Sequence, residues 1–286
     1  MSRIVWLASY PRSGNTWMRI FLTNIRRGGD QPADINSLVR EPIASAREDF
    51  DDALGVESSD LTVEEIERYR PHAYRQMAAD SVETLFLKIH DAFTLALGGD
   101  PIVPADVTLG AIYLVRNPLD VAVSFANYSG TFLDETISLM AQEGCVLAQS
   151  RCRLDRQLHQ RLLSWSSHIK SWLDKPTFPV HVIRYEDMFR YPQETFTKAA
   201  HFSGLPHDEE RVCRALKNSS FNVLQDQERI HGFRDRPATS QSFFRQGKAG
   251  SWREVLSKAQ IARIIQNHGK VMERLGYLST TGEILC

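Results

Sequence analysis

The chain has 286 residues, of which 42% are hydrophobic and 24% charged, and its formal net charge is −1. This length accommodates one large α/β domain or two small ones, and the composition is ordinary for a globular protein with a substantial core. A charge near zero excludes a global basic field that would attract nucleic acid or anionic membrane, although a local positive site remains compatible with it.

Targeting and redox signals are weak. The apolar run at residues 4–8 is too short for a signal-peptide core, and no apolar stretch is long enough to span a bilayer. The four cysteines, Cys145, Cys152, Cys213 and Cys286, show no C-x-x-C spacing. This favours free thiols, and a Cys145–Cys152 bridge stays an open alternative. These features predict a cytoplasmic protein.

Short apolar runs alternate with amphipathic segments along the chain. The runs are residues 4–8, 84–89, 111–115 and 180–183. Continuous apolar strands separated by helical patterns are typical of a parallel sheet built from βα units. The sequence therefore predicts an α/β fold, a single domain over residues 1–286 with a central parallel sheet flanked by helices.

Helical patterns fill the intervals between these runs. Gly28 and Gly29 end the first helix, and Asn117 with Pro118 provides the cap and first turn of the second. The predicted helices are residues 16–26, a helix from 118, and residues 154–173, 194–202, 208–216 and 257–275. The least regular stretches, near 30–80, 129–153 and 225–246, are interpreted as insertions covering an acceptor site.

A polar loop joins the first strand to the first helix, with the sequence Ser9-Tyr10-Pro11-Arg12-Ser13-Gly14-Asn15-Thr16. Strand, tight loop and helix N-terminus together direct backbone N–H groups at one point, which favours phosphate binding. Asn15 occupies the position of the lysine in the nucleotide P-loop, and a cation stands earlier, at Arg12. This difference argues against ordinary ATP or GTP hydrolysis and suits a donor with a 5′-phosphate and a sulfuryl group.

The segment from Tyr10 to Trp17, YPRSGNTW, resembles the 5′-phosphosulfate-binding loop of sulfotransferases that use 3′-phosphoadenosine-5′-phosphosulfate (PAPS). The resemblance implies a P-loop-like strand-loop-helix and donor binding by the residues of this loop. They are Arg12, Ser13, Gly14, Asn15, Thr16 and Trp17.

Two further segments resemble the 3′-phosphate site of this family. After the third strand, Leu-Val-Arg-Asn-Pro-x-Asp-x-x-x-Ser places Arg116 and Ser124 in the matching positions. Near the C-terminus, Arg245 and Gly247 match the family pattern R-K-G-x-x-G-x-W, and Gln246 stands where lysine is usual. The resemblance implies that these residues hold the 3′-phosphate, with backbone approach at Gly247.

Smaller matches concern the adenine. Tyr185 follows the fourth strand and resembles the family's adenine-contacting tyrosine, and Trp17 and Phe221 are expected to flank the base. The matching C-terminal segment consists of Ser219, Ser220, Phe221 and Leu224.

Lys88 and His90 close the second strand, where alternation puts their side chains on one face. They resemble the family's Lys-x-His, in which the histidine is the general base. A histidine with a near-neutral pKa can take the proton of an acceptor hydroxyl, while Arg12 stabilises the leaving oxygen and Lys88 the sulfuryl oxygens. The other eight histidines are interpreted as structural, and their spacing predicts no metal site.

The resemblance implies that the protein is a sulfotransferase, a transferase that uses PAPS as donor and releases PAP. The sulfuryl group would pass by in-line displacement to a hydroxyl or amine of a small-molecule, lipid-like or glycan-like acceptor. Two alternatives are a nucleotide or small-molecule kinase and a degenerate nucleotide-binding module or scaffold without activity. Asn15 disfavours the first. The second is disfavoured by the presence of the complete set, which is Arg12, Lys88, His90, Arg116 and Ser124. The family's short dimerisation motif is not evident, so the oligomeric state stays open; no nucleic-acid partner is expected.

Overall fold

A computed structural model describes residues 3–38, 42–148, 154–237 and 239–285 of the chain. Its contacts divide the chain into two compact units. Unit 1 consists of Met1–Tyr10, Val39–Tyr113 and Glu143–Val182, and unit 2 of Pro11–Leu38, Leu114–Gln142 and Ile183–Cys286. A single domain over the whole chain therefore stays a prediction.

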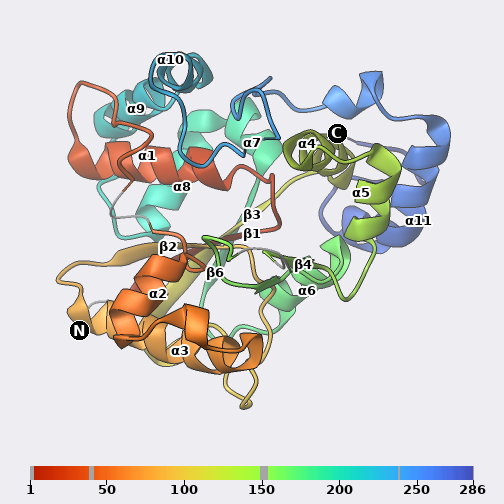
Figure 1. The fold of residues 1–286 in the computed structure, drawn as a ribbon. Coiled ribbons are helices and arrows are strands. Elements are labelled where there is room, and N and C mark those ends of the chain that lie inside the picture. Colours follow the sequence, from red (N-terminus) through yellow and green to blue (C-terminus); the bar gives the residue numbers. More distant parts are fainter. Residues whose placement is uncertain (1–2, 39–41, 149–153, 238, 286) are drawn as a thin grey trace. The chain divides into compact units, whose positions relative to one another are not determined.

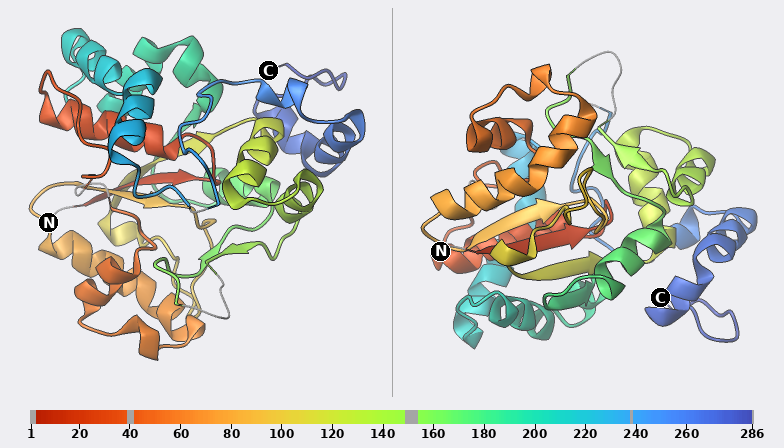
Figure 2. Two further views of the ribbon diagram at one scale, coloured as in Figure 1. Left: turned by 45° about the horizontal axis from the view of Figure 1, so that its top comes forward. Right: turned by 90° about the horizontal axis from the view of Figure 1, so that it is seen from below.

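The main sheet has the strand order β2-β1-β3-β6. β1 (Ile4–Ser9) pairs in parallel with β2 (Leu85–Ile89), and Ala8 faces Ile89 in the register (Figure 2). The other two strands are β3 (Thr108–Val115) and β6 (Val180–Arg184). The predicted α/β fold with a central parallel sheet is thus confirmed, and all four apolar runs are strands.

Burial explains why these runs form strands. Every residue of β1 is buried, and β3 is buried from Gly110 to its end, so their continuous apolar sequence meets packed side chains on both faces. β6 is different, because Val182 is exposed and most of its other residues are only half-buried. Its place at the end of the strand order accounts for this exposure.

Unit 1 carries a helical pair in the stretch that the sequence predicted to be irregular. α2 (Arg47–Leu54) packs on α3 (Val63–Asp80), and both are orange in Figure 1. A capping box between Thr62 and Glu65 starts α3 and offsets the unfavourable proline inside it, Pro71. The interpretation of residues 30–80 as irregular is therefore wrong. The charged, turn-rich composition of this stretch suggested loops, whereas Thr62 and Glu65 form a capping box that starts a helix.

The predicted helix at residues 154–173 is also only partly correct. Residues Gln160–Arg161 form a short strand, β5, antiparallel to β4 (Val146–Leu147), and the helix α6 covers only Trp165–Asp174. Leu158 and Leu162 are fully buried in this extended segment, although their spacing also fits a helix. Ser164 caps α6 by accepting a hydrogen bond from the backbone N–H of Ser167.

Unit 2 is mainly helical, and α1 (Asn15–Arg27) packs against α9 (Glu209–Asn218) in it (Figure 1). Gly28 ends α1 in the left-handed conformation, and Asn117 caps the helix that follows β3, as the sequence predicted. The remaining helices are α4 (Pro118–Ser129), α5 (Leu133–Met140), α7 (Tyr185–Arg190), α8 (Pro192–Phe202), α10 (Phe221–His231) and α11 (Lys258–Arg274).

The other two stretches interpreted as insertions also contain helices, since α5 lies within 129–153 and α10 reaches into 225–246. Cys145 and Cys213 are free thiols, whereas Cys152 and Cys286 lie outside the described residues, so the proposed bridge is untested. None of the helices formed by the described residues combines the length and apolar character needed to cross a bilayer.

Candidate active site

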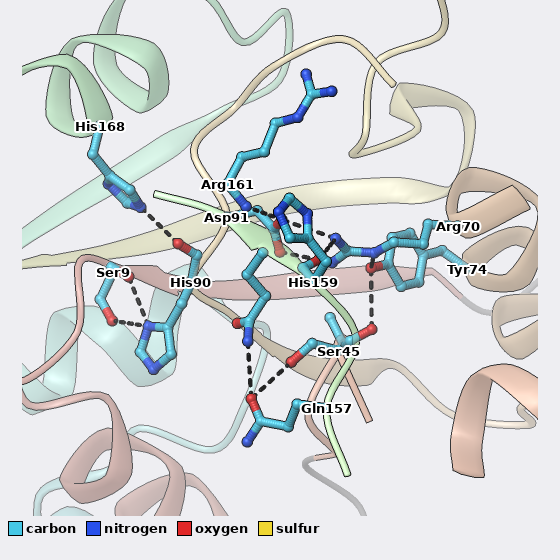
Figure 3. Close-up of polar contacts among 12 residues, drawn as sticks. Ser9, Ser45, Arg70, Tyr74, His90, Asp91, Gln157, His159, Arg161 and His168 are labelled. Carbon is cyan, nitrogen blue, oxygen red and sulfur yellow. Dashed lines mark hydrogen bonds and ion pairs between the residues drawn. The ribbon is translucent and has the colours of Figure 1, made fainter. Parts of the chain in front are cut away.

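The end of β2 brings His90 against the end of β1 within unit 1. Nδ1 of His90 lies 2.8 Å from the backbone oxygen of Ser9 and 3.2 Å from the Ser9 hydroxyl (Figure 3). A carbonyl oxygen can only accept, so Nδ1 carries a proton. His90 is half-buried.

A second histidine lies behind His90. Nε2 of His168 is 3.0 Å from the backbone oxygen of His90, and Nδ1 of His168 is 2.8 Å from the hydroxyl of Tyr113. Both His168 and Tyr113 are completely buried, and burial lowers the pKa of His168 to about 4. His168 is therefore neutral at pH 7, with Nε2–H donating to His90 and Nδ1 accepting from Tyr113.

Asp91, the next residue, is part of a buried ion pair. The Arg70 guanidinium binds both carboxylate oxygens, with N–O distances of 2.8 and 2.6 Å, and the backbone N–H of Arg161 donates to the first of them. Arg70 also donates to the hydroxyl of Tyr74 and to the backbone oxygen of His159 (Figure 3). This network joins α3 and β5 to the segment that carries His90.

Lys88 lies two residues before His90 in β2 and pairs with Leu7 in the parallel register. Its backbone also bonds to the chain on the other side, donating to Pro42 and accepting from Ala44. The side chain is 9% exposed. β2 ends at Ile89, so His90 is the first residue after the strand. That Lys88 and His90 share one face stays a prediction.

The loop after β1 contains two residues with positive φ, Arg12 at 67° and Gly14 at 97°. A Cβ on Gly14 would lie 2.6 Å from the ring of Tyr185, so only glycine fits beside that ring. α1 begins at the next residue, Asn15, without any side-chain cap. A helix N-terminus without a side-chain cap is the arrangement that binds anions in other proteins.

The Arg12 side chain is enclosed within unit 2. Its Nε donates to the Ser124 hydroxyl at 3.0 Å, and the guanidinium carbon lies 4.7 and 4.6 Å from the ring centres of Tyr128 and Phe243. Burial, and then the positive charges of Arg116 and Arg245, lower the pKa of Arg12 to about 10. The structure thus links Arg12, assigned to the 5′ end, to Ser124, assigned to the 3′-phosphate.

Arg116 follows β3 and is buried. Its two terminal nitrogens donate to the backbone oxygens of Arg12 and Lys248 at 3.2 and 3.1 Å, and its guanidinium stacks on the Tyr185 ring at 4.2 Å. The third donor, Nε, has no hydrogen-bond partner. The buried hydroxyl of Ser13 has none either.

Among the described residues, no carboxylate forms an ion pair with Arg12, Arg116 or Arg245. The buried Glu186 interacts electrostatically with Arg116 without such a pair. Like charges held together beside unsatisfied donors form a ready site for a multiply charged anion.

Asp120 organises the C-terminal segment of the predicted 3′-phosphate site. Its carboxylate accepts hydrogen bonds from the backbone N–H groups of Gly250 and Trp252 and from the Ser251 hydroxyl. Gly247, at φ 55°, leaves no room for a Cβ against the ring of Phe221. The structure therefore brings the segment with Arg245, Gln246 and Gly247 to the helix that bears Ser124.

The residues predicted to hold adenine also meet in unit 2. The Trp17 indole donates to the backbone oxygen of Ser219 at 2.9 Å and packs edge-on against Tyr185. Phe221 and Leu224 belong to the same apolar cluster as Trp17. Ser220 is the N-cap residue of α10.

The sequence did not predict several residues of these networks. His168 was interpreted as structural. No role was assigned to Tyr113, Arg70 or Phe243, because their partners lie far away in the sequence. Asp120 did carry a sequence signal, because it lies within the pattern that contains Arg116 and Ser124.

A comparison with known families settles the classification. The profile of the sulfotransferase domain matches residues 2–276. The chain belongs to the sulfotransferase family. Among curated relatives, rat (Rattus norvegicus) sulfotransferase 1A1 is 27% identical over 93% of this chain and 83% of the relative, and dog (Canis lupus familiaris) sulfotransferase 1B1 is 25% identical over 89% and 78%.

Solved structures share the fold of this sulfotransferase. A retinol dehydratase in a complex with retinol and PAP superposes with a TM-score of 0.63 at 19% identity, covering 96% of this chain and 82% of the other. Mouse sulfotransferase SULT7A1 complexed with PAP gives 0.58 at 19% identity, covering 95% and 85%. The likeness confirms the predicted fold class.

Proposed function

We propose that this sulfotransferase uses PAPS as the donor and transfers its sulfuryl group to a hydroxyl or amine of a small-molecule acceptor. The observation that carries the proposal is the cluster of Arg12, Arg116 and Arg245. None of the three forms an ion pair with a carboxylate of the described residues, and Arg116 has an unsatisfied buried N–H. PAPS has phosphate groups at two positions of one nucleoside, and the cluster spans two segments that each suit an anion.

The residues present fit such a donor. The N-terminus of α1 and the Ser13 hydroxyl would hold the 5′ end, where Gly14 leaves the backbone N–H groups accessible. Arg116, Ser124 and the segment from Arg245 through Gln246 to Gly247 would hold the 3′-phosphate. The adenine would contact the aromatic set of Trp17, Tyr185 and Phe221, with Ser219, Ser220 and Leu224 beside it.

His90 is the proposed general base. Because Nδ1 donates to Ser9, Nε2 is the ring atom that would take the proton of the acceptor as its oxygen or nitrogen attacks sulfur. Lys88, two residues earlier in the chain, would stabilise the sulfuryl oxygens, and Arg12 would stabilise the oxygen left on the donor's 5′-phosphate.

The acceptor is proposed only as a chemical class, a small molecule with a hydroxyl or amine. Solved relatives bind retinol and androsterone, which are alcohols, and a free hydroxyl matches the proton that His90 would accept. No group of three or more metal-binding side chains occurs in the part of the chain that the structure describes. The groups proposed to stabilise charge are Arg12, Lys88 and the N–H groups of α1.

Isothermal titration calorimetry with PAP and with ATP tests the donor assignment. PAP is expected to bind at micromolar concentration and ATP more weakly, and Arg116→Ala should abolish PAP binding because it removes a buried cation from the site. Arg75→Ala is the control and should bind PAP normally, because Arg75 belongs to α3 and lies more than ten residues in sequence from every donor segment. Tighter binding of ATP than of PAP, or full PAP affinity in Arg116→Ala, would overturn the assignment and revive the kinase alternative.

A further inference from the structure

The helix α6 makes three hydrogen bonds to the segment that follows β2. His168 donates to the backbone oxygen of His90, the Trp172 indole donates to the backbone oxygen of Asp91 at 2.9 Å, and the Ser171 hydroxyl accepts from the backbone N–H of Phe93 at 2.9 Å. His168 and Trp172 are four residues apart and so share one face of the helix. We call His168, Ser171 and Trp172 the α6 clamp.

The clamp is rigid because all of it is buried. His168 and Trp172 are fully buried and Ser171 is 1% exposed. The Ser171 hydroxyl donates back to the carbonyl of His168 at 2.6 Å, so its lone pair is directed at Phe93. The Tyr113 ring stacks on Trp172 and its hydroxyl contacts His168.

The carbonyl of His90 determines which nitrogen of His168 bears a proton, and the Tyr113 hydroxyl complements that choice. The carbonyl of His90 can only accept, so Nε2 of His168 must donate, and Nδ1 must then accept from the Tyr113 hydroxyl. The phenol is well suited to donate, because burial raises its pKa well above the ordinary value and keeps it protonated. The order of donation therefore runs from Tyr113 to His168 to the peptide of His90.

We propose that His168 is a positioning residue that fixes the peptide of His90 and thereby keeps the proton of the His90 ring on Nδ1. Two hydrogen bonds hold His90: its backbone carbonyl accepts from His168, and its ring Nδ1–H donates to the carbonyl of Ser9. Loss of the hydrogen bond from His168 would let the peptide of His90 move and so weaken the hydrogen bond from the ring to Ser9. The Nε2 lone pair then faces the acceptor in only part of the molecules. This role rests on the proposed function of His90 as the base.

The effect on turnover follows from geometry. A base displaced by about 1 Å can lose up to ~100-fold in rate, because proton transfer and attack on sulfur share one transition state. The segments that would bind the donor belong to unit 2, whereas the α6 clamp belongs to unit 1. Loss of His168 should consequently lower kcat and leave PAP affinity unchanged.

The test compares four variants by kcat, by PAP calorimetry and by nitrogen NMR of the His90 imidazole in isotope-labelled protein. His168→Phe removes the donor while retaining a ring, and His168→Gln restores an N–H that can reach the carbonyl of His90. Tyr113→Phe removes only the hydroxyl that orients His168. Ile169→Ala is the control, since Ile169 is equally buried in α6 but is apolar and so offers no side-chain hydrogen bond.

We expect kcat to fall roughly 10- to 100-fold in His168→Phe, to recover largely in His168→Gln, and to fall less in Tyr113→Phe. NMR should show the Nδ1-protonated form of His90 in the wild type, the Gln variant and the control, and a mixture of the two tautomers in His168→Phe. An unchanged tautomer and kcat in a folded His168→Phe, or an equal loss in the Gln variant and the control, would overturn the role. If His168→Phe does not fold, the same two readouts on Tyr113→Phe decide, and an unchanged tautomer there refutes it. The NMR result holds independently of whether His90 is the base, whose own test is turnover in His90→Ala.

Discussion

The Nδ1 atom of His90 lies 2.8 Å from the backbone oxygen of Ser9, so a residue at the end of β2 is oriented by the last residue of β1. The parallel register produces this relationship directly, because Ala8 pairs with Ile89 and the next residues of the two segments are Ser9 and His90. The last residue of β1 thus determines which ring nitrogen of His90 carries a proton.

Replacement of His90 by alanine should separate binding from chemistry. PAP affinity should be unchanged, while transfer to any accepted hydroxyl falls by about two to four orders of magnitude, the usual contribution of a general base. Calorimetry and a radiolabel transfer assay measure the two quantities. His72→Ala, at an exposed histidine, is the control. Turnover within threefold of wild type would remove His90 from its proposed role.

The aromatic enclosure of Arg12 should contribute to donor affinity. Tyr128→Leu removes one of the two rings that face the guanidinium, and a cation–π contact of about 0.5–2 kcal/mol corresponds to a ~2- to 30-fold weaker PAP binding. Tyr128→Phe keeps the ring and should bind PAP nearly as wild type. Equal affinities of the Leu and Phe variants would show that the ring does not support Arg12.

The ion pair of Arg70 and Asp91 should be important for stability. Both side chains are nearly inaccessible, and removal of one charge from such a pair costs about 3–5 kcal/mol because the other charge stays buried. We expect Asp91→Asn to lower the free energy of unfolding in urea by an amount in that range. The exposed ion pair of Glu194 and Lys198 offers a matched control. Glu194→Gln should change the free energy of unfolding by less than about 1 kcal/mol. A change below about 1 kcal/mol for Asp91→Asn would contradict the expectation.

The buried His168 should make the protein less stable in mild acid. Its pKa is about 4 in the folded protein, against an ordinary value of 6.5, because burial disfavours the charged ring. Between these values the unfolded chain binds a proton that the folded chain does not, so the free energy of unfolding falls as the pH drops from about 6.5 towards 4.

This loss should amount to roughly 2 kcal/mol between pH 7 and pH 5, counting His168 alone. Urea denaturation at the two pH values measures it as the difference between wild type and His168→Gln, because the glutamine does not titrate and all other groups are common to both. Wild type should lose more stability than the variant. An identical pH dependence of the two proteins would show that His168 does not carry the effect.

Sequence and structure contributed differently to the two parts of the molecule. The sequence by itself determined the strands, the loop from Tyr10 to Trp17 and the helix starts at Asn117 and Ser257, because these features depend on neighbours within a few residues. Local sequence patterns gave a wrong prediction where a helix and an extended chain both fit the spacing of the apolar residues. Leu158 and Leu162 fit a helix, but they are buried in an extended chain. Pairing with Val146–Leu147 makes the neighbouring residues the strand β5.

Only the tertiary structure decided how the candidate site is supported. His168 meets the hydroxyl of Tyr113 across 55 residues and the carbonyl of His90 across 78 residues, and no local pattern encodes such contacts. The sequence predicted the residues to which we assign the chemistry, which are Arg12, Lys88, His90 and Arg116. Folding selected the buried groups that orient them, because an N–H or a carboxylate removed from water must find a partner wherever the packed chain places one.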